Sequence, residues 1–79
     1  MKIRVKLFSV LRGCVKDYDP QLGVEIELAS HARVDDLIRH LNIPPDKAPV
    51  VSCDGRILKS DDFLTDGSEV NIFQPIAGG

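Results

Sequence analysis

The sequence has little of what enzymes and metalloproteins commonly use for chemistry. It has 79 residues, no tryptophan, one methionine, one tyrosine and two cysteines. A chain of this length has room for one small domain with a marginal hydrophobic core, which excludes most enzymes that carry a self-contained cleft. No nucleophile and base stand together in a known pattern, so we expect a protein without intrinsic catalysis that is a monomer when isolated.

Charge of one sign and long apolar runs are also lacking. Ten basic and twelve acidic residues give a formal charge of -2, and no run of lysine and arginine suggests nucleic acid as a partner. The apolar stretches are far too short to cross a bilayer, and no export signal is visible at the N-terminus. We expect a cytoplasmic protein with no membrane partner.

The cysteines and histidines form no cluster that would bind a metal. Cys14 and Cys53 belong to no CxxC pair, and neither has an adjacent base that would lower the pKa of its thiol. We predict that both are reduced packing residues, that no metal site exists, and that His31 and His40 face solvent.

Alternating polar and apolar residues predict two strands in the first half of the chain. Residues 2–7 alternate charged and apolar side chains, and residues 24–28 do the same, as in strands with one buried face. A short helical turn is expected between Val10 and Gly13. An antiparallel hairpin would place the basic residues of the first strand beside Glu25 and Glu27, either as a docking patch or, as we favour, as a solvated face of cross-strand pairs.

A helix is predicted over residues 33–42, because apolar residues recur there at the spacing i, i+3, i+4, i+7. Asp35 and Asp36 fall in its first turn and Arg39 and His40 near its last, as the helix dipole favours. Pro44-Pro45 forbids continuation of the helix.

Turn signals divide the second half into further strands. Asp54-Gly55 between residues 50–53 and 56–58 predicts a type I′ hairpin. Residues 60–64 are expected to form a single helical turn. Asp66-Gly67 predicts a turn before a last strand over residues 69–74.

This order of elements predicts an α+β roll. The helix must cover one face of a mixed sheet, in which the first and last strands can pair in parallel. Phe73 has the opposite parity to Val70 and Ile72, so its ring is expected outside the core as a partner anchor, packed against Phe8, or both.

The chain ends in a segment with little bulk. We divide the chain into a domain over residues 1–74 and a flexible tail over residues 75–79. In this tail, Pro75 favours an extended backbone. Ile76, Ala77, Gly78 and Gly79 would let the backbone enter a narrow channel of a partner. Simple fraying of the terminus is the alternative.

At this point the residues resemble a known family, the ubiquitin-like β-grasp sulfur carriers related to MoaD and ThiS. The resemblance covers nearly the whole chain. It is carried by Val5-Lys6-Leu7-Phe8, by Val34-Asp35-Asp36-Leu37-Ile38, by Asp66-Gly67-Ser68-Glu69-Val70, and above all by the last seven residues, Phe-Gln-Pro-Ile-Ala-Gly-Gly. It implies a mixed sheet of four to five strands with one main helix across one face.

The resemblance also implies a chemistry for Gly79. In this family an E1-like adenylyltransferase of the MoeB or ThiF type uses ATP and Mg to adenylate the terminal carboxylate, which then becomes a thiocarboxylate and donates sulfur. The carrier itself binds no cofactor. Acyl adenylation makes sense because a carboxylate is a poor electrophile, whereas the adenylate has a good leaving group.

Three branches of this resemblance stay open. The chain resembles the MoaD-like small subunit of molybdopterin synthase, which we favour, with the large subunit as sulfur acceptor. It also resembles the ThiS-like carrier that serves thiazole synthase, and a ubiquitin-like modifier that is joined to lysines. Arg33 stands where the family usually has threonine or serine as helix N-cap, so Ser30 is an alternative cap.

Overall fold

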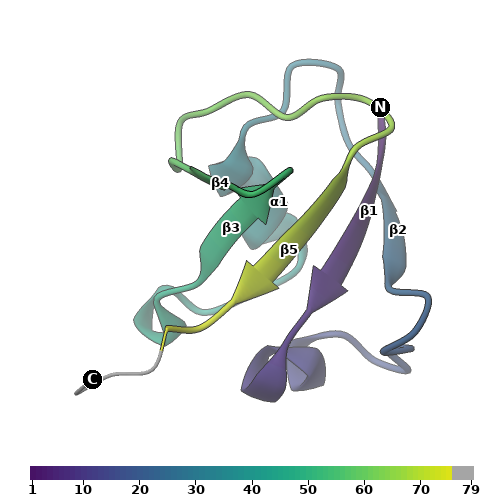
Figure 1. Ribbon diagram of the computed structural model, residues 1–79, viewed down its shortest axis with the longest axis vertical. Coiled ribbons are helices and arrows are strands. Elements are labelled where there is room, and N and C mark those ends of the chain that lie inside the picture. The colour runs from purple at the N-terminus through teal and green to yellow at the C-terminus, as the bar shows by residue number, and fades with distance from the viewer. Residues whose placement is uncertain (76–79) are drawn as a thin grey trace.

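The computed structural model describes residues 1–75, which form five strands, one α-helix and two 3-10 helices (Figure 1). The strands are β1 (Lys2–Leu7), β2 (Val24–Glu27), β3 (Val50–Cys53), β4 (Arg56–Leu58) and β5 (Glu69–Phe73), the α-helix is α1 (Val34–His40), and the 3-10 helices are η1 (Ser9–Cys14) and η2 (Pro45–Lys47).

The strands form one mixed sheet in the order β2-β1-β5-β3-β4. The central strands β1 and β5 are parallel, and every other neighbouring pair is antiparallel. Figure 1 shows α1 behind the sheet, on one face only. The predicted α+β roll, the first hairpin and the parallel pairing of the first and last strands are therefore confirmed.

The hydrophobic core lies between α1 and the sheet. The residues that are almost fully buried alternate along β1 and β5 and line one side of α1; they include Ile3, Val5, Leu7, Leu37, Val70 and Ile72. Burying each such side chain contributes about 1.5 to 3 kcal/mol. Cys14 and Cys53 are free, half-buried thiols that pack against this core, which confirms their predicted role.

The opposite face of β1 and β2 is charged and open to solvent. Arg4 lies 3.6 Å from Glu25 of β2, and Lys6 lies 3.9 Å from Glu69 of β5. Because these side chains are largely exposed, each pair stabilises the fold by about 1 kcal/mol at most. The arrangement supports the interpretation of a solvated face with cross-strand ion pairs.

The turn between β3 and β4 has the predicted geometry. Asp54 and Gly55 both have positive φ, 52° and 79°, as the two central residues of a type I′ turn require. The hairpin that this turn closes pairs Val51 with Leu58.

The first turn of α1 has no conventional N-cap side chain. Arg33 occupies the cap position without a side-chain cap bond. Instead the Asp36 carboxylate accepts the backbone N–H of Arg33 at 2.9 Å. The acidic residue in the first turn thus compensates in part for the missing serine or threonine.

The expected helical turn over residues 60–64 is wrong. The segment forms a turn followed by an extended bridge, in which Phe63 pairs with Arg33. Its backbone carbonyls cap α1: the carbonyl of Asp62 accepts the N–H of Val34 at 3.0 Å, and that of Ser60 accepts the N–H of Asp35 at 2.9 Å. These bonds satisfy N–H groups that would otherwise have no partner, and they take the place we had considered for Ser30.

The helix also ends earlier than the two prolines require. Asn42 adopts a left-handed φ of 58°, its N–H donates to the carbonyl of Arg39, and the N–H of Ile43 donates to the carbonyl of Ile38. This pattern is a Schellman motif. The helix stops at this motif, so Pro44-Pro45 is not what terminates it.

Asp36 should make the fold sensitive to acid. The hydrogen bond from the backbone of Arg33, and then that from Arg39, lower the pKa of Asp36 below its ordinary value. A lowered folded-state pKa gives stability that is present above the unfolded pKa and is lost as pH falls through the folded pKa. When the pH is lowered from about 5 to about 2, the Tm of the Asp36→Asn variant is therefore expected to fall by fewer degrees than the Tm of the wild type.

Thermal unfolding across this pH range measures the effect. Asp61→Asn serves as the matched control, because Asp61 is exposed and its replacement removes the same charge. Equal losses of Tm in the wild type and in Asp36→Asn would contradict the assignment.

Candidate functional site

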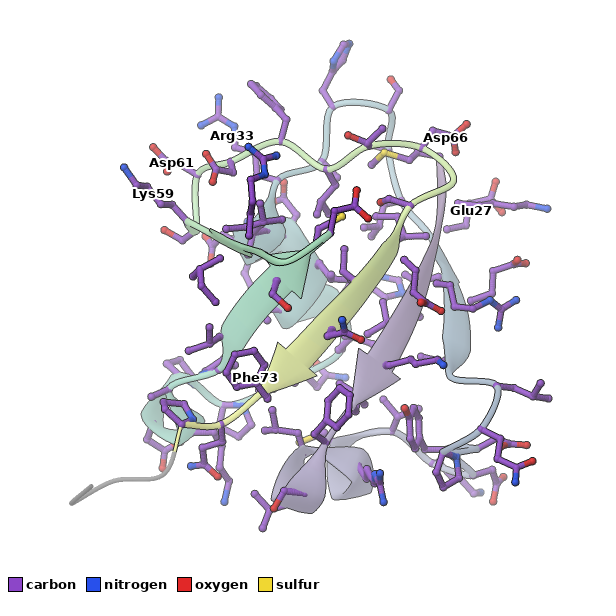
Figure 2. All side chains as sticks on the ribbon, viewed as in Figure 1. Glu27, Arg33, Lys59, Asp61, Asp66 and Phe73 are labelled. Atoms are coloured by element: carbon purple, nitrogen blue, oxygen red, sulfur yellow. The ribbon has the colours of Figure 1, made fainter. Side chains whose placement is uncertain are left out.

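The site predicted from the sequence begins where β5 ends. Ile76, Ala77, Gly78 and Gly79 lie outside the described residues, and Pro75, the last described residue, is exposed. Figure 2 shows Phe73 at the end of β5, beside the point where the chain leaves the sheet. The tail therefore begins at the end of the sheet around Phe73, and this end is the surface to consider for a partner.

A shallow hollow lies on this surface, on the sheet face opposite α1. It has a volume of about 380 Å³ and is lined by Phe8, Ser52, Asn71 and Phe73. Phe8 is 41% exposed, and Phe73 is half-buried. The structure thus places Phe73 and Phe8, which the sequence analysis considered together, around one hollow, and we name this site the Phe8–Phe73 hollow.

Strand register explains which side chains meet there. Ser52 of β3 lies opposite Asn71 of β5, and Val50 lies opposite Phe73. Directly opposed residues of antiparallel strands point to the same face. Ile57 of β4, which is opposite Ser52 and 63% exposed, extends the apolar margin of the hollow. Within the described residues, this face of the sheet therefore has a charged part over β1 and β2 and a part without ion pairs around the hollow.

A tyrosine that the sequence analysis did not single out secures the end of β1 next to the hollow. The N–H of Leu7 donates to the hydroxyl of Tyr18 at 2.7 Å, and that hydroxyl donates to the carbonyl of Leu7 at 3.3 Å. Arg12 donates to the same carbonyl at 3.2 Å. The pairing of β1 with β2 stops at Val5, so Tyr18 supplies the bonds that a strand partner would make. No local pattern in the sequence signals this contact.

Cys53, the last residue of β3, does not have the properties of a reactive thiol. Burial, and next the neighbouring Asp54, raise the pKa of the Cys53 thiol, so this thiol is protonated at neutral pH and is a weak nucleophile. His31 and His40 are exposed, as predicted. Within residues 1–75 no three histidine, cysteine, aspartate or glutamate side chains gather to hold a metal. In the same residues, no helix combines the length and apolar character needed to cross a membrane.

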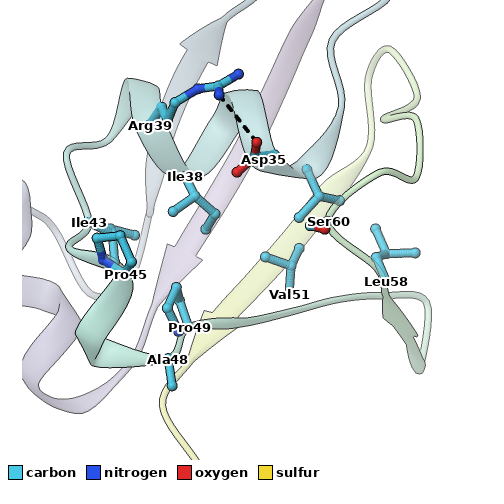
Figure 3. Close-up of a pocket in the computed structure, with 11 residues that line it drawn as sticks. Asp35, Ile38, Arg39, Ile43, Pro45, Ala48, Pro49, Val51, Leu58 and Ser60 are labelled. Carbon is cyan, nitrogen blue, oxygen red and sulfur yellow. Dashed lines mark ion pairs between the residues drawn. The ribbon is translucent and has the colours of Figure 1, made fainter.

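A second hollow, also of about 380 Å³, lies on the helix side of the sheet (Figure 3). Apolar side chains of α1, β3 and the segment around η2 form most of its wall. Its charged lining residues, Asp35 and Arg39, form an ion pair at 3.2 Å. Since Val51 lines this hollow and Ser52 lines the other, the two lie on opposite faces of the sheet.

Solved structures of the same architecture define the class of protein. SAMP1 from Haloferax volcanii superposes with a TM-score of 0.71 at 19% identity, over 100% of both chains. A candidate molybdopterin converting factor, subunit 1, from Pyrococcus furiosus superposes with a TM-score of 0.72 at 29% identity, over 95% of this chain and 98% of that one. Another structure, of small archaeal modifier protein 1 from H. volcanii, gives a TM-score of 0.72 at 18% identity, over the same shares. The fold is the ubiquitin-like β-grasp.

The family follows from the sequence comparison. A model of the ThiS family matches residues 5–79, so the chain belongs to the ThiS family and is by family a ubiquitin-fold sulfur carrier or modifier. A search of curated proteins gave no match.

Proposed function

We propose that this protein is a sulfur carrier whose Gly79 carboxylate is activated by an E1-like adenylyltransferase. The carboxylate attacks the α-phosphate of ATP, pyrophosphate leaves, and a sulfur nucleophile then displaces AMP to leave a thiocarboxylate. ATP and Mg belong to the partner enzyme, and the carrier supplies the carboxylate and the docking surface. The observation that carries the proposal is the match of a ThiS family model through to the terminal Gly78-Gly79.

The short reach of the last four residues supports this role. The four residues 76–79 span at most about 14 Å when fully extended. An enzyme that acts on the carboxylate of Gly79 must therefore approach the end of β5 closely. The Phe8–Phe73 hollow lies at this end of the sheet, so we assign it to the interface with that enzyme.

We favour molybdopterin synthesis as the destination of the sulfur. The supporting observation is the likeness to the candidate molybdopterin converting factor, subunit 1, at 29% identity. In this pathway the tail would insert into the large subunit of molybdopterin synthase. The family match favours a ThiS-like carrier for thiazole synthase as second candidate, and the fold shared with SAMP1 from H. volcanii admits a modifier of lysines.

Reconstitution separates these candidates. The protein is incubated with ATP, Mg, the E1-like enzyme of its own genome and a sulfur source, and intact mass reports replacement of oxygen by sulfur. The thiocarboxylate form is then offered to the large molybdopterin synthase subunit and to thiazole synthase. Sulfur transfer to the first only is expected. Adducts on protein lysines without a thiocarboxylate would establish the modifier instead.

Phe73 is expected to act as an anchor for the activating enzyme. Replacing Phe73 with alanine removes a ring from the hollow and should weaken binding by about 1 to 3 kcal/mol, as loss of an interfacial aromatic does. Isothermal titration calorimetry measures the affinity, and circular dichroism checks that the fold is intact. Phe63→Ala is the matched control, because Phe63 is 60% exposed and does not line the hollow.

An unchanged affinity of Phe73→Ala would contradict the anchor role. An unfolded variant would show that the ring serves packing against Phe8 and the sheet.

A further inference from the structure

We propose that Asn71, assisted by Ser52, is a specificity-determining residue that binds a main-chain peptide group of the activating enzyme inside the Phe8–Phe73 hollow. A neutral apolar side chain of the same enzyme segment would occupy the space between the rings. This inference rests on the proposed function and names the chemistry by which the carrier and its enzyme recognise each other.

The first observation is the position of Asn71. It lies on β5, next to Lys6 of β1 on one side and opposite Ser52 of β3 on the other. Its side chain and that of Ser52 line the hollow together with the two rings. Both residues are half-buried, so the hollow combines polar groups with the apolar rings of Phe8 and Phe73.

The second observation is that these polar groups have no side-chain hydrogen-bond partner among residues 1–75. The side-chain hydrogen bonds formed within residues 1–75 use other groups, and none of them involves the Asn71 carboxamide or the Ser52 hydroxyl. A carboxamide carries a carbonyl acceptor and an amide donor, which match the N–H and C=O of a peptide group. A partner that covers the hollow must satisfy these groups or leave them buried without a partner.

The third observation concerns charge and decides what the occupant is. Among residues 1–75 no ionisable side chain lines the hollow, and Lys6, which neighbours Asn71 across the β1–β5 pairing, is paired with Glu69. A charged side chain of the partner would lose its hydration there without meeting an opposite charge. The occupant is therefore neutral, with an apolar side chain for the rings and a peptide group for Asn71.

The tail identifies the partner that provides this segment. Four residues separate Pro75 from the terminus and reach about 14 Å at most, so the enzyme that adenylates Gly79 has to cover the sheet end that contains Asn71. Asn71 is held in β5, eight residues before the reacting carboxylate of Gly79. It should therefore contribute to docking and leave the chemical step unchanged.

Kinetics of pyrophosphate release by the E1-like enzyme test this role. Asn71→Ala is expected to raise the KM for the carrier about tenfold, and Asn71→Asp, which adds a charge, about a hundredfold, with kcat within about twofold of the wild type. Ser52→Ala should raise KM by about threefold. Glu25→Gln, on the charged half of the same face, is the matched control and should leave both constants unchanged.

The outcomes are distinct. A KM within about twofold of the wild type for both Asn71 variants overturns the inference and leaves the proposed function intact. A fall in kcat at constant KM also overturns it, because Asn71 would then act on the tail and not on docking. If the wild type is adenylated by no E1-like enzyme of its genome, the proposed function fails and the inference fails with it. Thermal unfolding checks each variant, and if Asn71→Asp does not fold, Asn71→Ala and Ser52→Ala decide.

Discussion

Deletion of Gly79 is expected to abolish activation of this protein by its E1-like enzyme. The carboxylate of Gly79 must reach the α-phosphate of ATP, and removal of one residue withdraws it by about 3.5 Å. A misplacement of about 1 Å can already cost a hundredfold in rate. Pyrophosphate release should therefore fall below detection for the shortened chain, while thermal unfolding stays as in the wild type.

Extension by one residue should have the same effect. An added alanine after Gly79 carries the carboxylate past the reacting position and introduces a side chain next to the two terminal glycines. The experiment compares the wild type, the deletion and the extension with ATP, Mg and a sulfur source, and intact mass detects sulfur at the C-terminus. Sulfur on either altered chain would show that Gly79 is not required.

The sequence predicted those parts of the fold in which local pattern and tertiary structure agree. Alternation along residues 2–7 predicted β1, because a strand with one buried face needs apolar residues at every second position. Asp54-Gly55 predicted a turn with two positive φ angles, since few other residue pairs adopt these angles with little conformational strain. In both cases the physical cause lies within a few residues of the chain.

The cap of α1 could not be predicted in this way. Ser60 and Asp62 suggested a helical turn of their own, because serine and aspartate are common caps. In the structure their backbone carbonyls, and not their side chains, form the cap of α1. The carbonyl of Asp62 accepts the N–H of Val34, and the carbonyl of Ser60 accepts the N–H of Asp35. The partners lie 25 and 28 residues apart in the chain, so only the folded structure reveals the contact.

The candidate site was predictable in part for the same reason. The parity of Phe73 placed its ring outside the core, as a partner anchor or packed against Phe8, and both rings line the hollow. Asn71 and Ser52 escaped notice, because their meeting depends on the strand order β1-β5-β3 and on the register of β3 with β5. Neither property can be read from either segment alone.

Gly23 supports the hairpin that carries β1. It has a φ of +72°, and a Cβ atom built on it would lie 2.6 Å from the carbonyl oxygen of Val5, which belongs to the backbone of β1. Since backbone atoms of a central strand cannot move aside without disturbing the pairs of Val5 with Val24 and Val70, this position tolerates no side chain.

Gly23→Ala is therefore expected to lower the free energy of unfolding by about 2 to 5 kcal/mol, of which about 1 to 3 comes from the left-handed backbone and the rest from the clash with Val5. This is a large share of the stability of a small domain, and Tm should fall by on the order of 10 to 40 °C. Gly55→Ala separates the two causes, because Gly55 has a φ of +79° and no atom lies within 4 Å of its Cβ position. This variant should therefore be destabilised only by the strain of a left-handed backbone. Urea unfolding of both variants measures the difference. If Gly23→Ala loses no more stability than Gly55→Ala, the close approach of Gly23 to β1 does not constrain the fold.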